Sequence, residues 1–272
     1  MIICVVGPTG SGKSKLAEKL ADFYDGIIIN FDAFQIYKKM NIGTAKPSIT
    51  ELKSGRYFLY DFVDPKEEFD VSKYQVICRD FINKNLDKNL ILVGGTGLNL
   101  KAVLYDYKFE NEEPMPSDYL SNVPNEELYK KLHSIDAIDA EKIGINNRKR
   151  LLRALYIYEI HGVSKTKLNN NGRNNILYNN VHILGLNYER DYLYNLINKR
   201  VDSMFDLGLQ KEVEELLKEY GKDCKALQAI GYKEFIEYDD INTIRDIIKQ
   251  HTRNYAKRQL SWFRADKNIH WF

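Results

Sequence analysis

The first residues of the chain constrain its fold most strongly, because an apolar run, a glycine-rich loop and an amphipathic helix follow one another directly. The apolar run spans residues 2–6, and the loop that follows reads Gly-Pro-Thr-Gly-Ser-Gly-Lys-Ser over residues 7–14. The pattern G-x-x-x-x-G-K-[ST] between a strand and a helix is typical of a phosphate-binding loop. A plain strand–turn–helix is the alternative, but the fixed positions and both flanks agree with the phosphate loop.

Each type of residue in this loop has a predicted part in holding a phosphate. Glycines let the backbone wrap closely around the anion, and the loop N–H groups and the helix N-terminus point at it. Lys13 adds a positive charge, and the hydroxyl of Ser14 can reach a bound Mg²⁺. The predicted phosphate-binding residues are Gly7, Pro8, Thr9, Gly10, Ser11, Gly12, Lys13 and Ser14. The pattern leaves open whether the phosphate belongs to ATP, and whether it is transferred or leaves.

Two further strand ends are expected beside this loop. A buried strand over 26–32 ends in Asp32, and another over 90–93 is followed by Gly-Gly-Thr-Gly, which contains Thr96. The carboxyl ends of parallel strands line the ligand crevice of an open sheet. The sequence alone leaves Asp32 as a Mg²⁺ ligand, a helix cap or a base, and leaves the second glycine loop as a ligand contact or a tight turn. A third strand is predicted over 57–63.

The composition indicates a reduced, cytoplasmic protein with a substantial core. Of the 272 residues, 44% are hydrophobic, and the three cysteines are far apart and lack metal-ligand spacing. Free thiols are typical of the cytosol. No apolar run approaches the ~20 residues of a membrane span, and the short run before the loop does not resemble a signal peptide, so no membrane partner is expected.

The patterns predict an α/β fold, a P-loop parallel sheet flanked by helices, with an all-helical insertion. The catalytic core is expected over 1–106 and 181–272, and the insertion over 107–180, where three helical patterns begin near 126, 137 and 148. The net charge is only +2, but basic residues gather at 142–153 and 249–267. Basic residues interleaved with aromatic ones suit RNA binding, although solvated helix faces and core aromatics are the alternative.

Eight segments in order along nearly the whole chain resemble those of bacterial tRNA dimethylallyltransferases, also called isopentenyl-tRNA transferases. They are GPTGSGKS (7–14), DAFQIY (32–37), IGTAKP (42–47), GGTGL (94–98), RLLRAL (150–155), KRVDSMFDLGL (199–209), ALQAIGYKE (226–234) and TRNYAKRQLSWFR (252–264). The resemblance implies transfer of a dimethylallyl group from its diphosphate to N6 of the adenine 3′ of the anticodon, assisted by Mg²⁺. Its implied partners are dimethylallyl diphosphate and the tRNA anticodon stem-loop, which the insertion grips, and we expect a monomer.

The resemblance also implies a role for individual residues. Asp32 falls on the general base, Thr96 on the threonine of the second glycine loop, and Arg200 on an arginine that binds diphosphate. Lys13 and the phosphate loop then hold the leaving diphosphate rather than ATP, with Ser14 on Mg²⁺. The implied tRNA-binding residues are Asp32, Ala33, Phe34, Gln35, Lys149, Arg150, Arg153, Gln228, Gly231, Tyr232, Lys233, Thr252, Arg253, Lys257, Arg258 and Gln259.

The chain departs from the family pattern at several positions outside the residues assigned to chemistry. Ala33 stands where the family usually has serine, and Asn99 stands where it has tyrosine. Three other functions share the phosphate loop: a small-molecule kinase, an enzyme that prenylates free adenine nucleotides, and an RNA-binding module with a vestigial loop. The two basic segments argue against the first two.

Overall fold

The computed structural model describes residues 1–109, 115–164, 166–167 and 175–272. The chain forms two compact units, one made of Met1–Leu104 with Tyr178–Phe272 and the other of Tyr105–Leu177. The sequence analysis placed the insertion at 107–180. Among the described helices, none has the length and apolar character needed to cross a membrane.

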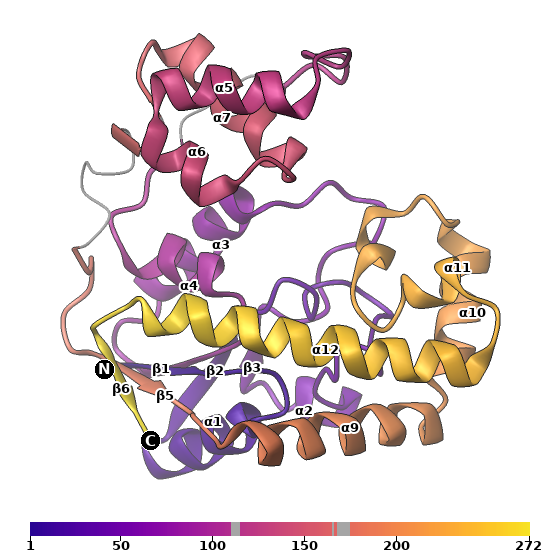
Figure 1. Cartoon of the computed structure of the whole chain (residues 1–272). Coiled ribbons are helices and arrows are strands. Elements are labelled where there is room, and N and C mark those ends of the chain that lie inside the picture. The colour runs from indigo at the N-terminus through magenta and orange to yellow at the C-terminus, as the bar shows by residue number, and fades with distance from the viewer. Residues whose placement is uncertain (110–114, 165, 168–174) are drawn as a thin grey trace. The chain divides into compact units, whose positions relative to one another are not determined.

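The first unit is built on a six-stranded sheet in which every neighbouring pair is parallel (Figure 1). Its order is β3-β2-β4-β1-β5-β6. The central strand β1 pairs with β4 and β5 and is fully buried, which explains its unbroken apolar sequence. This confirms the predicted parallel sheet. The strands are β1 (Ile2–Val6), β2 (Gly26–Asn30), β3 (Tyr57–Phe58), β4 (Asn89–Val93), β5 (Val181–Gly185) and β6 (Ile269–Trp271).

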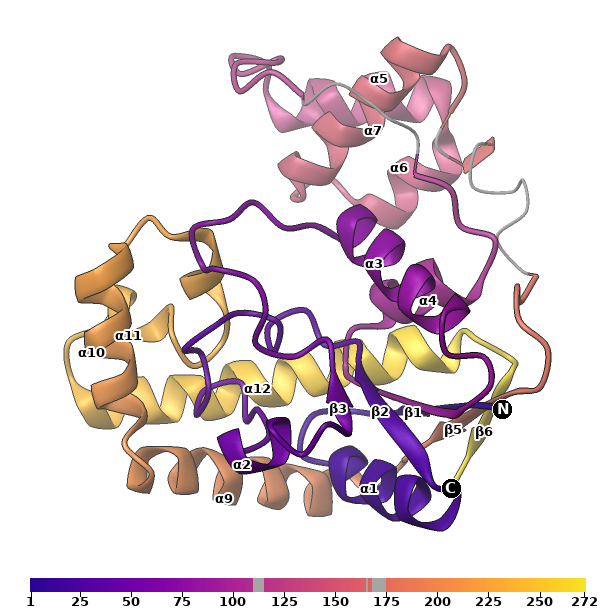
Figure 2. The same ribbon diagram turned by 180° about the vertical axis from the view of Figure 1, so that it is seen from behind.

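Helices cover both faces of this sheet. Alternate strand residues such as Ile3 and Ile28 pack against α1 (Lys13–Phe23), because successive side chains of a strand point to opposite faces. On the other face lie α3 (Val71–Asn83) and α4 (Gly97–Leu104), and Figure 2 shows the strands between them and α1. The phenol of Tyr74 on α3 donates to the Asn30 carbonyl oxygen of β2 at 2.6 Å, which ties the helix to the sheet.

The segment after β5 is mostly helical, and its longest helix is α12 (Ile241–Arg264), which β6 follows. Asp240 caps the amino end of α12, where its carboxylate accepts the Thr243 N–H at 2.8 Å. Helix α12 packs alongside α9 (Figures 1 and 2). The other helices of this unit are α2 (Ile49–Leu52), α9 (Arg190–Asp206), α10 (Leu209–Tyr220), a 3₁₀ turn (Lys225–Gln228) and α11 (Glu234–Glu237).

The strand predicted over 57–63 is shorter than expected, because β3 ends at Phe58. Leu59 and Asp61 have φ values of 62° and 55°, a left-handed conformation that cannot continue a strand. Side chains from elsewhere hold this bend: the Asn30 amide donates to the Leu59 carbonyl at 2.9 Å, and Asp61 pairs with Lys46 at 2.6 Å.

The second unit contains the three helices that the sequence predicted, α5 (Asn125–Ile135), α6 (Ala137–Ile143) and α7 (Arg148–His161). Leucines of α5 and α7 form its core, with Leu128 and Leu151 fully buried. The Arg148 guanidinium donates to the carbonyls of Val123 at 2.6 Å and Leu120 at 2.7 Å. It therefore holds the loop before α5.

Candidate active site

The phosphate loop has the backbone that its glycines predict. Gly10 and Gly12 both have φ of 80°, and a Cβ on Gly10 would lie 3.0 Å from Ile197 Cγ1. Helix α1 begins at Lys13, so its free N–H groups open onto the loop. The Ser11 hydroxyl is buried and has no hydrogen-bond partner within the described part of the chain, as befits a donor whose partner is a ligand.

Two cations meet beside this loop. The ammonium of Lys13 donates to the Pro8 carbonyl oxygen at 2.7 Å. Burial and, to a smaller extent, the nearby Arg200 lower the pKa of Lys13 to about 7, and the Asp32 carboxylate partly opposes both effects. Burial likewise lowers the pKa of Arg200, and Asp32 again acts in the opposite direction. The three predicted residues therefore lie close enough to influence one another's charge.

Asp32 lies two residues after the end of β2, and hydrogen bonds with its neighbours fix its position. Its Oδ1 accepts the Phe34 N–H at 2.9 Å, while its own N–H donates to Asn30 Oδ1 at 2.9 Å. A Cβ on Gly95 would lie 3.4 Å from Asp32 Oδ2, so this oxygen faces the second glycine loop. One carboxylate oxygen thus orients the side chain, which leaves Oδ2 as the candidate proton acceptor.

Thr96 joins the ends of two neighbouring strands. Its Oγ1 accepts the N–H of Ala33 at 3.0 Å, which links the loop after β4 to the residue after Asp32. Asn99, the departure from the family pattern, is 5% exposed, and its amide donates to the Phe31 carbonyl at 3.2 Å. Both contacts draw the ends of β2 and β4 together, as expected for adjacent parallel strands.

Gln259 of α12 is buried between the two glycine loops. Its Oε1 accepts the Thr9 N–H at 2.8 Å, and its Nε2 donates to the Gly95 carbonyl at 2.9 Å. Tyr255, one turn earlier, lies in the same cluster. Burial and the Asp32 charge raise the pKa of Tyr255, and the side chains of Thr96 and Gln259 partly offset this. The sequence analysis did not assign Tyr255 to the site; its place one turn before Gln259 on the same helix was the available signal.

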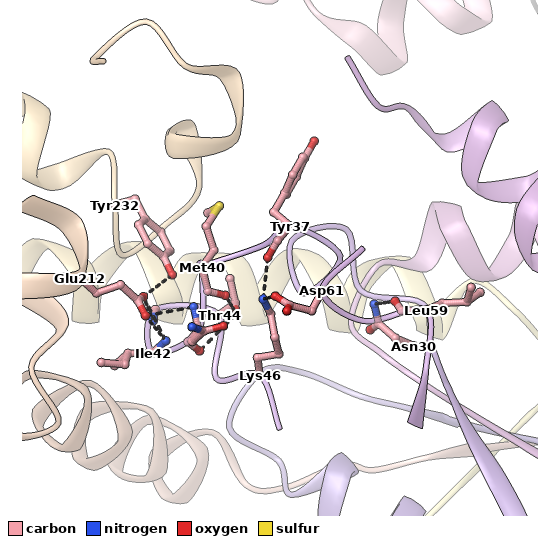
Figure 3. Close-up of polar contacts among 12 residues, drawn as sticks. Asn30, Tyr37, Met40, Ile42, Thr44, Lys46, Leu59, Asp61, Glu212 and Tyr232 are labelled. Carbon is pink, nitrogen blue, oxygen red and sulfur yellow. Dashed lines mark hydrogen bonds and ion pairs between the residues drawn. The ribbon is translucent and has the colours of Figure 1, made fainter. Parts of the chain in front are cut away.

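The loop over 41–46, which overlaps the segment IGTAKP (42–47), is held by side chains from distant elements (Figure 3). Glu212 of α10 accepts the N–H groups of Ile42 at 2.8 Å and Gly43 at 3.1 Å, and the phenol of Tyr232 at 2.7 Å. The Tyr232 ring packs so closely on Gly43 that a Cβ there would lie 2.5 Å from it. Glu212 therefore holds this loop the way an anion is held by successive backbone amides.

Lys46 fixes the other end of this loop. Its ammonium is inaccessible to solvent, donates to the Tyr37 carbonyl at 2.5 Å and pairs with Asp61 at 2.6 Å (Figure 3). Gln35 donates to the carbonyls of Thr44 and Ala45, both at 3.0 Å. A cavity of about 410 Å³ beside the loop has Ile42, Lys46 and Arg200 among its lining residues.

The remaining predicted RNA-binding residues differ in exposure. Lys257 and Arg258 on α12 are exposed, and so are the basic residues Lys149, Arg150 and Arg153 on α7. Thr252 and Arg253 make internal contacts: Thr252 donates to the Ile248 carbonyl at 2.7 Å, and Arg253 to Asn198 Oδ1 at 2.7 Å.

The segment ALQAIGYKE is more internal than its predicted role suggests. Gln228 is exposed and Lys233 partly exposed, but Tyr232 is fully buried. Gly231, with φ of 96°, donates its N–H to Glu234 Oε2 at 2.8 Å. The buried Glu234 also contacts His251 Nδ1 of α12 at 2.6 Å. RNA contact by these residues stays a prediction, and the structure shows that Tyr232 supports the 41–46 loop.

The residues beside the phosphate loop can hold a metal ion that is also bound by a phosphorylated ligand. Among the described residues, there is no group of three or more His, Cys, Asp or Glu side chains that could hold a metal. Ser14 lies exposed in the first turn of α1, beside the loop. Mg²⁺ commonly takes one or two protein oxygens and completes its shell with substrate phosphates and water. The donor set is thus compatible with Mg²⁺ bound through Ser14 and a diphosphate.

Comparison with known proteins places the chain in a family. The model of the family described as IPP transferase matches residues 35–266. The tRNA dimethylallyltransferase of Anoxybacillus flavithermus is 41% identical over 100% of this chain and 89% of its own length. That of Acetivibrio thermocellus is 38% identical over 99% of this chain and 90% of its own length.

Solved structures agree with this placement. The tRNA isopentenylpyrophosphate transferase of Bacillus halodurans superposes with a TM-score of 0.74 at 35% identity, covering 100% of this chain and 89% of the other. A eukaryotic dimethylallyltransferase acting on tRNA superposes with a TM-score of 0.85 at 27% identity, covering 100% of this chain and 73% of the other. The chain belongs to the IPP transferase family, as its sequence motifs predicted.

Proposed function

We propose that this protein transfers a dimethylallyl group from dimethylallyl diphosphate to N6 of the adenine 3′ of the anticodon in tRNA. The observation that carries the proposal is the meeting of Lys13 and Arg200 with the Asp32 carboxylate beside the phosphate loop. The cations can stabilise an anion that leaves, and the carboxylate beside them can accept the proton that an amine loses. The family relatives named tRNA dimethylallyltransferase support the choice of substrates.

The reaction has one bond to break and one to form. The carbon–oxygen bond to the diphosphate breaks, and its electron pair leaves with the diphosphate. The loop N–H groups, Lys13 and Arg200 stabilise the negative charge that develops there. Ser14 would hold a Mg²⁺ ion, which would add positive charge beside the leaving diphosphate.

The adenine amine is a weak nucleophile, because its lone pair is delocalised into the ring. N6 bonds to the allylic carbon as its proton passes to Asp32 Oδ2, a carboxylate oriented through its other oxygen. The base must first leave the stacked anticodon loop, as in other base-modifying enzymes. Exposed basic residues on α7 and α12 supply affinity for the RNA backbone without reading its sequence.

Offering the protein two different prenyl acceptors distinguishes this function from the alternative functions. The protein is incubated with Mg²⁺ and dimethylallyl diphosphate, with either unmodified tRNA or AMP, and the products are identified by mass spectrometry. We expect isopentenyladenosine in tRNA and none on AMP. A product on AMP alone indicates a nucleotide prenyltransferase. No prenyl transfer to either acceptor would contradict the proposal and leave a kinase or an RNA-binding module as the alternative.

A further inference from the structure

The inner face of α12 carries one side chain that touches both glycine loops. Gln259 is only 5% exposed and lies next to Lys257 and Arg258, which are exposed. Its amide oxygen accepts from the phosphate loop at Thr9, and its amide nitrogen donates to the second glycine loop at Gly95. Both ends of the amide are therefore occupied by backbone groups, although its sequence position suggested RNA contact.

The fit around this amide is close. A Cβ on Gly95 would collide with Gln259 Nε2, so a side chain at residue 95 would displace the Gln259 amide from the second loop. The Thr9 N–H, a loop amide that could face a phosphate, is directed to Gln259 instead. A side chain in such a place determines how far apart the two loops lie.

The two loops lead to the two halves of the proposed reaction. The phosphate loop holds the leaving group through Lys13 and its amides. Gly95 is followed by Thr96, whose hydroxyl oxygen accepts the N–H of Ala33, next to Asp32. A continuous path of bonds thus runs from Thr9 through Gln259, Gly95 and Thr96 to the backbone beside the carboxylate.

We propose that Gln259 is a positioning residue, which sets the distance between the diphosphate loop and the carboxylate that accepts the adenine proton. The inference rests on the proposed function for its chemistry. An amide suits the task because it offers a donor and an acceptor at a fixed separation and adds no charge to the site. A displacement of about 1 Å in such a site can lower the rate about 100-fold.

The test separates positioning from RNA contact with three variants. Gln259→Met keeps the length and removes both hydrogen bonds, and Gln259→Glu keeps only an acceptor. Gln250→Met, the same change at an exposed glutamine of the same helix, is the matched control. For each protein we would measure the transfer rate at saturating substrates, the Kd for tRNA, the Kd for inorganic diphosphate, and the thermal midpoint.

We expect both Gln259 variants to lose about 10–100-fold in the saturated transfer rate, with a Kd for tRNA within about twofold of wild type. Gln259→Met should also weaken binding of inorganic diphosphate several-fold. Gln250→Met should leave the saturated rate, both Kd values and the thermal midpoint as in the wild-type protein.

Two results would overturn the proposal. If Gln259→Met raises the Kd for tRNA but keeps the saturated rate, Gln259 is an RNA contact. If the variants lower the thermal midpoint but retain normal rates and diphosphate affinity per folded molecule, the side chain is only structural. Failure of the proposed function is distinguishable, since the wild-type protein would then modify no tRNA, while its diphosphate affinity would still report on Gln259.

Discussion

At the scale of single residues, the site contains partly buried charges of opposite sign. Burial and the like charge of Arg200 both disfavour the charged form of Lys13. Asp32 offsets part of this cost. A bound diphosphate would offset more of it, because opposite charges nearby favour the protonated lysine. The chemistry of the site should therefore depend on pH through Lys13.

The affinity for diphosphate should fall as the pH rises through neutrality. In the free protein the pKa of Lys13 is lowered to about 7, so the ammonium is mostly present below this pH and lost above it. A bound anion raises the pKa, so above pH 7 each pH unit should weaken binding by up to about tenfold until the bound-state pKa is reached. Calorimetric titration with inorganic diphosphate from pH 7 to 9 measures this.

Lys13→Gln is the control for that titration, because it removes the lysine but not the ionisation of the diphosphate itself. It should bind weakly at every pH and lack the decline above pH 7. An equal decline in both proteins would mean that Lys13 is charged throughout this range.

Replacing the proposed base should stop turnover but spare RNA binding. Asp32→Asn keeps the shape and the acceptor for the Phe34 N–H but cannot take up a proton. The single-turnover rate should fall by about 10²–10⁴-fold, with the Kd for tRNA nearly unchanged. Asp25→Asn, exposed just before the amino end of β2, is the control and should behave as wild type. Weaker tRNA binding at a normal rate would make Asp32 a recognition residue.

Among the elements, the loop over 41–46 depends most on contacts distant in sequence. It has no strand or helix of its own, and the Glu212 carboxylate satisfies several of its N–H groups from 170 residues away. At the other end of the loop, Lys46 donates to the Tyr37 carbonyl, and Gln35 donates to the Thr44 carbonyl. Because the loop lines the same cavity as Arg200, its shape contributes to the site.

Glu212→Gln should destabilise the protein more than an ordinary surface change. The amide keeps one acceptor but puts an NH₂ group among N–H donors, at a cost of about 1–3 kcal/mol in the free energy of unfolding. Urea denaturation monitored by circular dichroism measures this. Glu214→Gln, exposed on the same helix, is the control and should change stability by less than about 0.5 kcal/mol. Equal effects of the two changes would show that the loop contacts contribute little.

Over the whole molecule, the features that carry a periodic pattern or a motif could be predicted from the sequence. Isolated contacts between residues distant in the sequence could not. The parallel sheet, the helices of the second unit and the phosphate loop each repeat a pattern that neighbouring residues share. The proximity of Asp32 to Thr96 followed from both lying at strand ends. Nothing local marks Glu212, Lys46 or the inward side of Gln259, because a side chain bound to a distant backbone leaves no period in the sequence. The bend at Leu59, which shortens β3, could not be predicted for the same reason, because the distant Asn30 side chain holds it.

The helical unit should contribute to RNA affinity mainly through charge. Arg150 is exposed on α7, and its replacement by alanine should weaken tRNA binding and reduce the slope of log K against log salt by about 0.7–0.9. Filter binding from 50 to 300 mM KCl measures the slope. Lys218→Ala, exposed on α10, is the control and should leave the slope unchanged. An unchanged slope for Arg150→Ala would remove this residue from the phosphate contacts.

The most direct test of the account is to map the modified nucleoside within the RNA. Unmodified tRNA is treated with the wild-type protein, Mg²⁺ and dimethylallyl diphosphate, then digested by a nuclease and sequenced by tandem mass spectrometry. The account predicts a single dimethylallyl group on the adenosine 3′ of the anticodon, and none after treatment with Asp32→Asn. A group on another nucleotide, or no transfer to RNA by the wild-type protein, would contradict it.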